Sequence, residues 1–320
     1  MTTVHSAPGT SRTAVGGRAG ASRGGDGPGG RARRRRTGAP RPGGPRRPHP
    51  VGDGRLAALP LVLALVIAFP LILLLVNAFK SPQDYATSGP LDLPTSFHTD
   101  GVVRFWTEKN FPLALWNSFF IAGTVAVLAV VVSVLNAFAL GIGRVRGRTW
   151  LTLLFLMANL LPQEMLVYPL FTMFDKASLL SNPWSVIITF TVIQGAFGTY
   201  LLASLYGTFP KEILEAAALD GASRFRTLVS VVVPVSRPTL SVLMVFFFIW
   251  TWNEFLLPLS FLNRPGSLTV PLVLEQLSGE RQTDVTTLIS ATLLSVIPTI
   301  VFFLIFQRTL TRGITAGAVK

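Results

Sequence analysis

The sequence lacks cysteine altogether and is poor in histidine. Without cysteine the 320-residue chain forms no disulfide and offers neither a thiolate metal ligand nor a thiol nucleophile. Its three histidines, at positions 5, 49 and 98, all lie outside the long apolar stretches. A zinc site or a histidine-based triad has almost no side chains to be built from, so we expect no metal site and no catalytic residues.

Charge is also scarce, since only 13% of the residues are charged while 50% are hydrophobic and the mean hydropathy is +0.53. Soluble globular domains carry about 25% charged residues. So few charges cover a protein surface only if much of that surface faces lipid. The apolar content is equally far above that of a disordered chain.

The basic excess is concentrated at the N-terminus. Residues 1–55 contain 12 arginines and 2 aspartates, which supply +10 of the net charge of +13, together with 14 of the 28 glycines. This composition cannot bury enough apolar surface to fold, so we predict a disordered cytoplasmic tail. An interpretation as a binder of nucleic acid or anionic lipid is open, but the arginines alternate with glycine and proline rather than with stacking aromatics. We favour a solvated arm that fixes topology and expect no nucleic-acid partner.

Beyond the tail, residues 56–320 contain six apolar segments of 21 to 25 residues each. They are Leu56–Phe79, Ser118–Ile142, Trp150–Phe174, Trp184–Tyr206, Pro238–Leu262 and Thr286–Phe306. At ~1.5 Å per residue each is long enough to cross a hydrocarbon core of about 30 Å. The sequence therefore predicts an all-α integral membrane protein with six transmembrane helices.

The loops between these segments predict the orientation. With the tail in the cytoplasm, the inner loops carry ten Lys and Arg residues besides those of the tail, and the outer loops carry six. This asymmetry places both termini in the cytoplasm of a cell membrane. The longest outer loop, Lys80–Asn117, is expected to be an ordered cap. No GxxxxGK[ST] phosphate loop occurs, so we expect no ATP hydrolysis by this chain alone.

The inner loop 207–237 has its own pattern. Pro210 suits the first turn of a helix, Gly221 suits its end, and Asp220 is expected to cap a second short helix that begins near Ala222. The pattern predicts a helix–glycine–helix elbow at the inner membrane face. The alternative is an amphipathic loop that only covers the helix bundle.

The same loop resembles the signature loop of permease subunits of binding-protein-dependent ABC importers. The matching residues are Glu215, Ala216, Ala217, Gly221, Val231, Val233 and Pro234. Valines stand where Ile and Leu are commonest near the end of the motif. The resemblance implies that this elbow docks into a cleft on an ATPase. We expect Glu215 to make charge-assisted contacts either at the ATPase surface or with inner basic residues of this chain, the alanines to allow close packing and Gly221 to set the turn.

Further segments resemble the second, maltose-type (MalG-like) permease of carbohydrate importers. They are Asn117-Ser118, Leu161–Glu164 with Pro169, Trp252–Phe255, and Gln307-Arg308 with Gly313–Gly317. The resemblance covers residues 56–320 and not the tail. It implies a sugar or polyol as solute, a second permease chain, two ATPase subunits that bind ATP and Mg, and an extracytoplasmic binding protein. It implies no cofactor on this chain.

Two carboxylates, Glu164 and Glu254, fall within predicted membrane helices, where burial is expensive unless they face protein or water. Counted along straight helices, both lie in the outer half of the membrane. Together with Asn159, Gln163 and Asn253 they either line a translocation path or only fix helix packing, and the sequence leaves both interpretations open.

Two other functions also stay open. One is an ABC permease for a non-sugar solute such as glycerol phosphate or a peptide. The other is an ion-coupled secondary transporter in which Glu164 and Glu254 relay protons. The elbow motif favours the ABC importer over the second of these. A membrane enzyme is disfavoured, because there is no cysteine and no histidine at membrane level.

Overall fold

The computed structural model describes residues 54–143, 145–279 and 285–318, with side chains for 60–143, 145–279 and 285–308. The tail predicted for residues 1–55 therefore lies almost entirely outside the described residues. Within them the structure contains helices and no strand.

The α-helices are α1 Gly54–Asn77, α2 Pro82–Ser88, α3 Asp100–Glu108, α4 Phe111–Ala137, α5 Arg148–Ala158, α6 Val167–Lys176, α7 Pro183–Gly207, α8 Lys211–Leu219, α9 Arg224–Thr227, α10 Val233–Trp252, α11 Leu256–Phe261, α12 Val270–Gly279 and α13 Val285–Ala318. Four shorter segments are the π-helices η1 Phe138–Ile142 and η3 Leu228–Val232 and the 3-10 helices η2 Gln163–Leu166 and η4 Pro265–Ser267.

Five continuous helical stretches among the described residues are long and apolar enough to cross a membrane, and a bent pair makes a sixth. The five are Pro60–Asn77, Phe111–Ile142, Pro183–Gly207, Arg224–Trp252 and Val285–Arg308. The predicted all-α membrane architecture is confirmed.

The third predicted span, Trp150–Phe174, is not one straight helix. It consists of α5 followed by η2 and α6, with a bend of 91° between the two halves. Pro162 explains the break, because its ring removes a backbone N–H and its own backbone is extended at ψ 128°. The count along a straight helix that placed Glu164 in the outer half of the membrane therefore does not apply to this segment.

The fifth predicted span, Pro238–Leu262, is shifted along the chain. The observed helix starts at Arg224, runs through α9, η3 and α10, and ends at Trp252. Its apolar continuation forms the separate short helix α11 after a break at Asn253 and Glu254. A polar pair rather than the end of the apolar run thus terminates the span.

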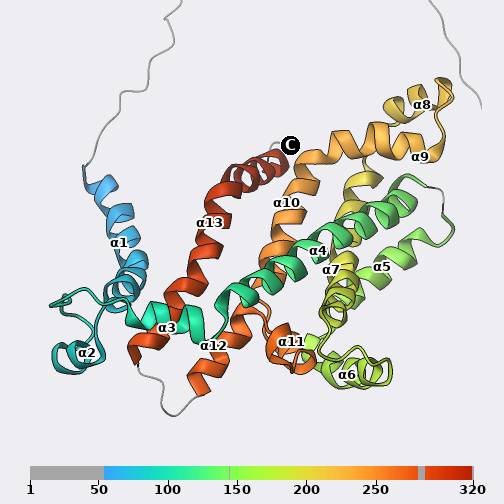
Figure 1. Cartoon of the computed structure of the whole chain (residues 1–320). Coiled ribbons are helices and arrows are strands. Elements are labelled where there is room, and N and C mark those ends of the chain that lie inside the picture. The colour runs from blue at the N-terminus through green and yellow to red at the C-terminus, as the bar shows by residue number, and fades with distance from the viewer. Residues whose placement is uncertain (1–53, 144, 280–284, 319–320) are drawn as a thin grey trace, which may run out of the picture. The chain divides into compact units, whose positions relative to one another are not determined.

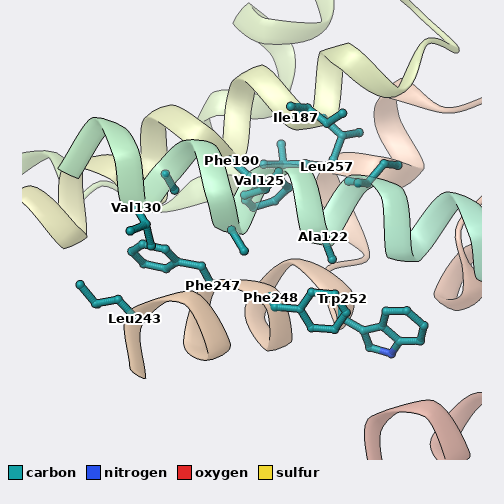
Figure 2. Close-up of a cluster of buried hydrophobic side chains, with 14 of the residues drawn as sticks. Ala122, Val125, Val130, Ile187, Phe190, Leu243, Phe247, Phe248, Trp252 and Leu257 are labelled. Atoms are coloured by element: carbon teal, nitrogen blue, oxygen red, sulfur yellow. The ribbon is translucent and has the colours of Figure 1, made fainter. Parts of the chain in front are cut away.

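The core lies where α4 packs along α7 and α10. Figure 2 shows side chains of these three helices and of α11 meeting, among them Val125, Phe190 and Phe247. A buried amide also joins two of the helices, because Gln194 Nε2 of α7 donates to Thr251 Oγ1 of α10 at 2.8 Å. Such bonds satisfy polar groups that lipid cannot.

Gly198 allows the close approach of α4 and α7. A Cβ atom built at this position would lie 2.8 Å from Ser133 Cβ and 3.0 Å from Phe247 Cζ. Neither neighbour has room to move, since both are fully buried. Small residues at membrane helix crossings bring backbones together in this way.

The loop of residues 80–117, predicted to be an ordered cap, contains the helices α2 and α3 and the start of α4. Its helix α2 is capped by Ser81, and the Asp84 carboxylate accepts a hydrogen bond from the backbone N–H of Thr95 at 3.1 Å. Lys80 Nζ donates to the carbonyl oxygen of Gly89 at 2.7 Å. These bonds hold the chain between α1 and α3 in one conformation.

Asn117 and Ser118 do not open the second membrane helix, because α4 begins six residues earlier at Phe111. Asn117 Nδ2 instead donates to the carbonyl oxygens of Gly266 and Leu268, each at 3.0 Å, and Ser118 Oγ accepts from the N–H of Val270 at 2.9 Å. The pair therefore anchors the segment before α12 to α4. Helix α12 was not predicted, because its ten residues are too few for an apolar segment that spans a membrane.

Candidate functional site

The predicted elbow is present and projects from one end of the helix bundle. Figure 1 shows α8 and α9 at the end where α13 finishes, whereas α2, α3, α6, α11 and α12 lie at the opposite end. The elbow therefore connects the adjacent ends of the two membrane helices α7 and α10.

Gly221 forms the turn of the elbow. Its backbone is left-handed with φ +71°, a conformation that glycine adopts without the steric strain of a Cβ atom. The N–H of Gly221 donates to the carbonyl oxygen of Ala218, and the N–H of Ala222 donates to that of Ala217, both at 3.0 Å. These two bonds form a Schellman motif, which satisfies the last carbonyls of α8.

The predicted cap of the second arm is corrected by the structure. Asp220 is the last residue associated with α8, and Ser223 caps α9 instead by accepting from the N–H of Arg226 at 3.3 Å. Asp220 lies before the left-handed turn, so its side chain is in the wrong place to reach the amides of α9. The second arm is also not a separate helix, because it continues through η3 into α10.

The residues of the motif divide into an exposed and a buried group. Glu215 and Ala216 are exposed on α8, while Ala217 is only 8% exposed and faces the rest of the protein. Glu215 forms no ion pair with any described residue. A carboxylate on this surface is free to contact a partner.

Exposed apolar side chains on the elbow are residues that sequence reasoning missed. Leu219 is 91% exposed and Phe225 is 71% exposed, and they flank Gly221 on its two sides. Leu219 lies outside the membrane-spanning helices, and Phe225 lies in the first turn of the helix that runs from Arg224 to Trp252. Apolar residues next to the motif in an otherwise polar loop were the available signal.

The end of the motif lies where the second arm becomes the membrane helix. Val231 is part of the π-helix η3, and Val233 and Pro234 form the first turn of α10, all three half-buried. Val233 N–H donates to the carbonyl oxygen of Leu228, five residues before it. The π-helical turn η3 therefore ends next to Pro234, which has no backbone N–H to donate.

The five residues predicted for a translocation path lie at two helix breaks. Asn159, Gln163 and Glu164 occupy the break between α5 and α6, and Asn253 and Glu254 occupy the break between α10 and α11. The helices α6 and α11, which follow the two breaks, are in contact, and the ring centroids of Phe174 and Phe261 lie 5.2 Å apart. Interrupted helices at membrane depth are tolerated where they line a cavity or are buried in protein.

The two glutamates differ in their surroundings. The Glu254 carboxylate accepts hydrogen bonds from the backbone amides of residues 255–257 at the start of α11, and it is close enough to Glu164 for the two charges to interact. Glu164 is exposed and forms no ion pair with a described residue. The backbone thus satisfies Glu254, while Glu164 is open to solvent or a ligand.

The amides at these breaks are also held by backbone. Asn159 Nδ2 donates to the carbonyl oxygen of Phe155 at 2.6 Å, and Asn253 Nδ2 donates to that of Ile249 at 2.7 Å. Each bond satisfies a carbonyl in the last turn of an interrupted helix. The side-chain oxygens of both amides are left as acceptors for hydroxyl groups.

Comparison with known proteins places this geometry in a family. Residues 134–316, which include the elbow and both sides of it, match the model of the binding-protein-dependent transport system inner membrane component. The match covers more than half of the chain.

Two relatives extend the similarity over most of residues 56–320. The chain is 28% identical over 81% of its length to the trehalose/maltose transport system permease protein MalG of Thermococcus litoralis, of which it covers 94%. It is also 28% identical over 79% of its length to the sulfoquinovosyl glycerol transport system permease protein SmoH of Agrobacterium fabrum, of which it covers 88%.

A solved structure shares the fold. It is a chain in the crystal structure of a bacterial ABC transporter involved in the import of the acidic polysaccharide alginate, with a TM-score of 0.70 and 22% sequence identity. The alignment covers 80% of the present chain and 95% of that chain.

Proposed function

Because the chain belongs to the family of binding-protein-dependent transport system inner membrane components, we propose that it is a permease subunit of an ATP-driven importer for an oligosaccharide or related polyol. The names of its relatives support this solute class, since MalG is named for trehalose and maltose and SmoH for sulfoquinovosyl glycerol. A non-sugar solute is the second candidate within the same class of transporter.

The observation that carries the coupling role is the exposed elbow. A short helix that ends in a Schellman turn is rigid, and it is tethered on one side by α7 and on the other by the continuous helix α9–η3–α10. Its exposed Leu219 and Phe225 have no apolar cover of their own. We propose that an ATPase subunit covers them, so that closure of an ATPase dimer moves α10 through this lever.

Partners follow from the same role. The chain carries no phosphate loop, so ATP and Mg bind to the ATPase subunits rather than here. A second permease chain completes the path, and an extracytoplasmic binding protein delivers the solute. This chain itself needs no cofactor and performs no catalysis.

The test is purification of the assembled complex from native membranes followed by uptake in proteoliposomes. We expect a second permease and an ATPase to co-purify in fixed ratio, and uptake of labelled oligosaccharide to require ATP and a binding protein. Recovery of the chain alone, with uptake driven by a proton gradient, would support the ion-coupled carrier instead. Competition among unlabelled sugars, polyols and glycerol phosphate then identifies the solute class.

For the orientation, we propose that the elbow and both termini are cytoplasmic. The excess of basic residues at this end supports it. Because the chain has no cysteine, a single Glu212→Cys on α8 and a single Ser96→Cys on the opposite cap are clean probes. In intact cells a membrane-impermeant maleimide is expected to label only Ser96→Cys. Labelling of Glu212→Cys alone would reverse the topology.

For the path, we propose that the two helix breaks line it, with Glu164 facing the solute and Glu254 holding the α10–α11 break. Glu254→Gln keeps an acceptor oxygen for the amides of 255–257, so we expect uptake within about twofold of the unmodified protein. Glu164→Gln removes an exposed charge, and we expect a higher KM for the solute. An unchanged KM in Glu164→Gln would mean that the break only shapes helix packing.

A further inference from the structure

A groove with basic side chains in its walls lies between the elbow and the adjacent ends of the membrane helices. It consists of two hollows of about 510 Å³ and about 380 Å³ that share Gly141, Arg148 and Gly207 as walls. The first continues under α8, and the second continues between α5 and α7. We call the whole feature the Arg148 groove.

The groove has the chemistry of an anion site. Arg148 lines both hollows and Lys211 lines the first, whereas Glu215 is the only acidic residue among their walls. Neither base forms an ion pair with a residue that the structure describes. The second hollow has no acidic wall, and the hydroxyls of Thr149 and Ser204 on it donate no hydrogen bond to the described part of the chain.

The backbone beside Arg148 adds to this. Arg148 is the first residue of the eleven-residue helix α5, and the preceding Gly147 has no side chain to cap it. The first amides of a helix carry partial positive charge and favour an anion. Arg148 and the start of α5 therefore lie where the two hollows meet, with Lys211 on the wall of the first and the hydroxyls of Thr149 and Ser204 on the wall of the second.

One side of the groove leads onto apolar surface. Leu153 lines the second hollow, and Leu154 and Met157 continue along α5 with exposures of 63% and 59%. A soluble anion would contact only the basic walls of the groove. A phospholipid would contact both surfaces, with its phosphate at the basic walls and its acyl chains along the apolar side chains of α5. Basic pockets at the cytoplasmic ends of membrane helices are suited to anionic headgroups.

We propose that the Arg148 groove binds the headgroup of an anionic phospholipid from the cytoplasmic leaflet. The proposal rests on the proposed function for one point only, the placement of this end of the helices on the cytoplasmic side. A lipid headgroup held by Arg148 lies close to Lys211 in the first turn of α8. It thereby supports the elbow from the membrane side.

The experiment compares Arg148→Gln with Arg146→Gln in the assembled complex. Arg146 lies two residues before Arg148, is exposed, and lines neither hollow, so it is a control with the same loss of charge. Both are placed in nanodiscs of phosphatidylcholine with about one quarter phosphatidylglycerol, and retained lipid is measured by native mass spectrometry after detergent extraction. We expect retention of phosphatidylglycerol to fall about fivefold in Arg148→Gln and to be unchanged in Arg146→Gln.

Several results would overturn the proposal. Equal retention in the two variants would remove Arg148 from the site, and equal retention of the two lipids by the unmodified complex would remove the preference for an anion. Displacement of the lipid by inorganic phosphate at millimolar concentration would indicate a soluble anion. Arg148→Lys keeps the charge and is expected to retain most of the lipid, which excludes misfolding as the cause. Because retention needs no ATP, failure of transport leaves this result intact.

Discussion

Replacement of Glu215 by lysine is expected to abolish solute uptake while the chain still enters the membrane. Glu215 is exposed on α8 and forms no ion pair with a described residue, so its removal leaves the packing of the bundle unchanged. At a docked interface, a reversed charge faces a surface that is complementary to a carboxylate. Loss of one partner of such a pair costs about 2–5 kcal/mol, which corresponds to a decrease in uptake of about 30-fold or more.

The matched control for this prediction is Glu212→Lys on the same helix. It makes the same change in net charge at an exposed position in the first turn of α8, outside the motif. Uptake per transporter in the membrane and co-purification of the ATPase are measured for both variants. Equal loss in the two would attribute the effect to the charge of the loop as a whole, and normal uptake in Glu215→Lys would contradict the coupling role of α8.

The elbow was predictable because each of its parts follows from local chemistry. Pro210 precedes a helix of good helix formers, and Gly221 is the residue type that a left-handed turn requires. The wrong detail was the cap, since Asp220 and Ser223 are both good N-cap residues and only the position of the turn decides between them. The π-helix η3 could not be predicted, because it differs from the α-helices around it only in its hydrogen-bond register and no pattern of residues marks it.

The membrane helices were predictable in number but not in course. The length of an apolar segment indicates that it can span the membrane, but it does not show where the helix bends. The third and fifth segments were therefore predicted as straight helices. Pro162 and the pair Asn253-Glu254 are polar or helix-breaking residues within these apolar runs, and both mark the breaks. The residues of the proposed path lie at these same two breaks, so the interruptions of the apolar runs are informative about function.

The joint between the elbow and the bundle depends on contacts distant in sequence. Ala217 is buried on the underside of α8. Residues of α5 and of the elbow line the same hollow of the Arg148 groove, although some sixty residues separate them in the sequence. No periodicity within either segment predicts this proximity. The face of α8 that carries Glu215 is therefore defined only by the tertiary structure, even though the residue itself was identified from the motif.

Substitution of Gly221 by valine is expected to decrease uptake about 5- to 30-fold without loss of the chain from the membrane. The surroundings leave space, since a Cβ atom at this position would have no neighbour within 4 Å. The effect therefore arises from the backbone alone. A φ of +71° costs an L-residue about 1–2 kcal/mol, and the strain is relieved by breaking the Schellman bonds that set the angle between α8 and α9.

The variant Gly221→Asn tests whether the left-handed backbone at position 221 is the cause of the decrease in uptake. Asparagine adopts the left-handed conformation more readily than other L-residues, and the open space accommodates its side chain, so uptake is expected to exceed that of Gly221→Ala, with Gly221→Val lowest. The order is measured as uptake per transporter, with ATPase activity of the complex in parallel. If valine and asparagine were equivalent, the turn would not depend on a left-handed residue, and the elbow would act as a flexible tether rather than a lever.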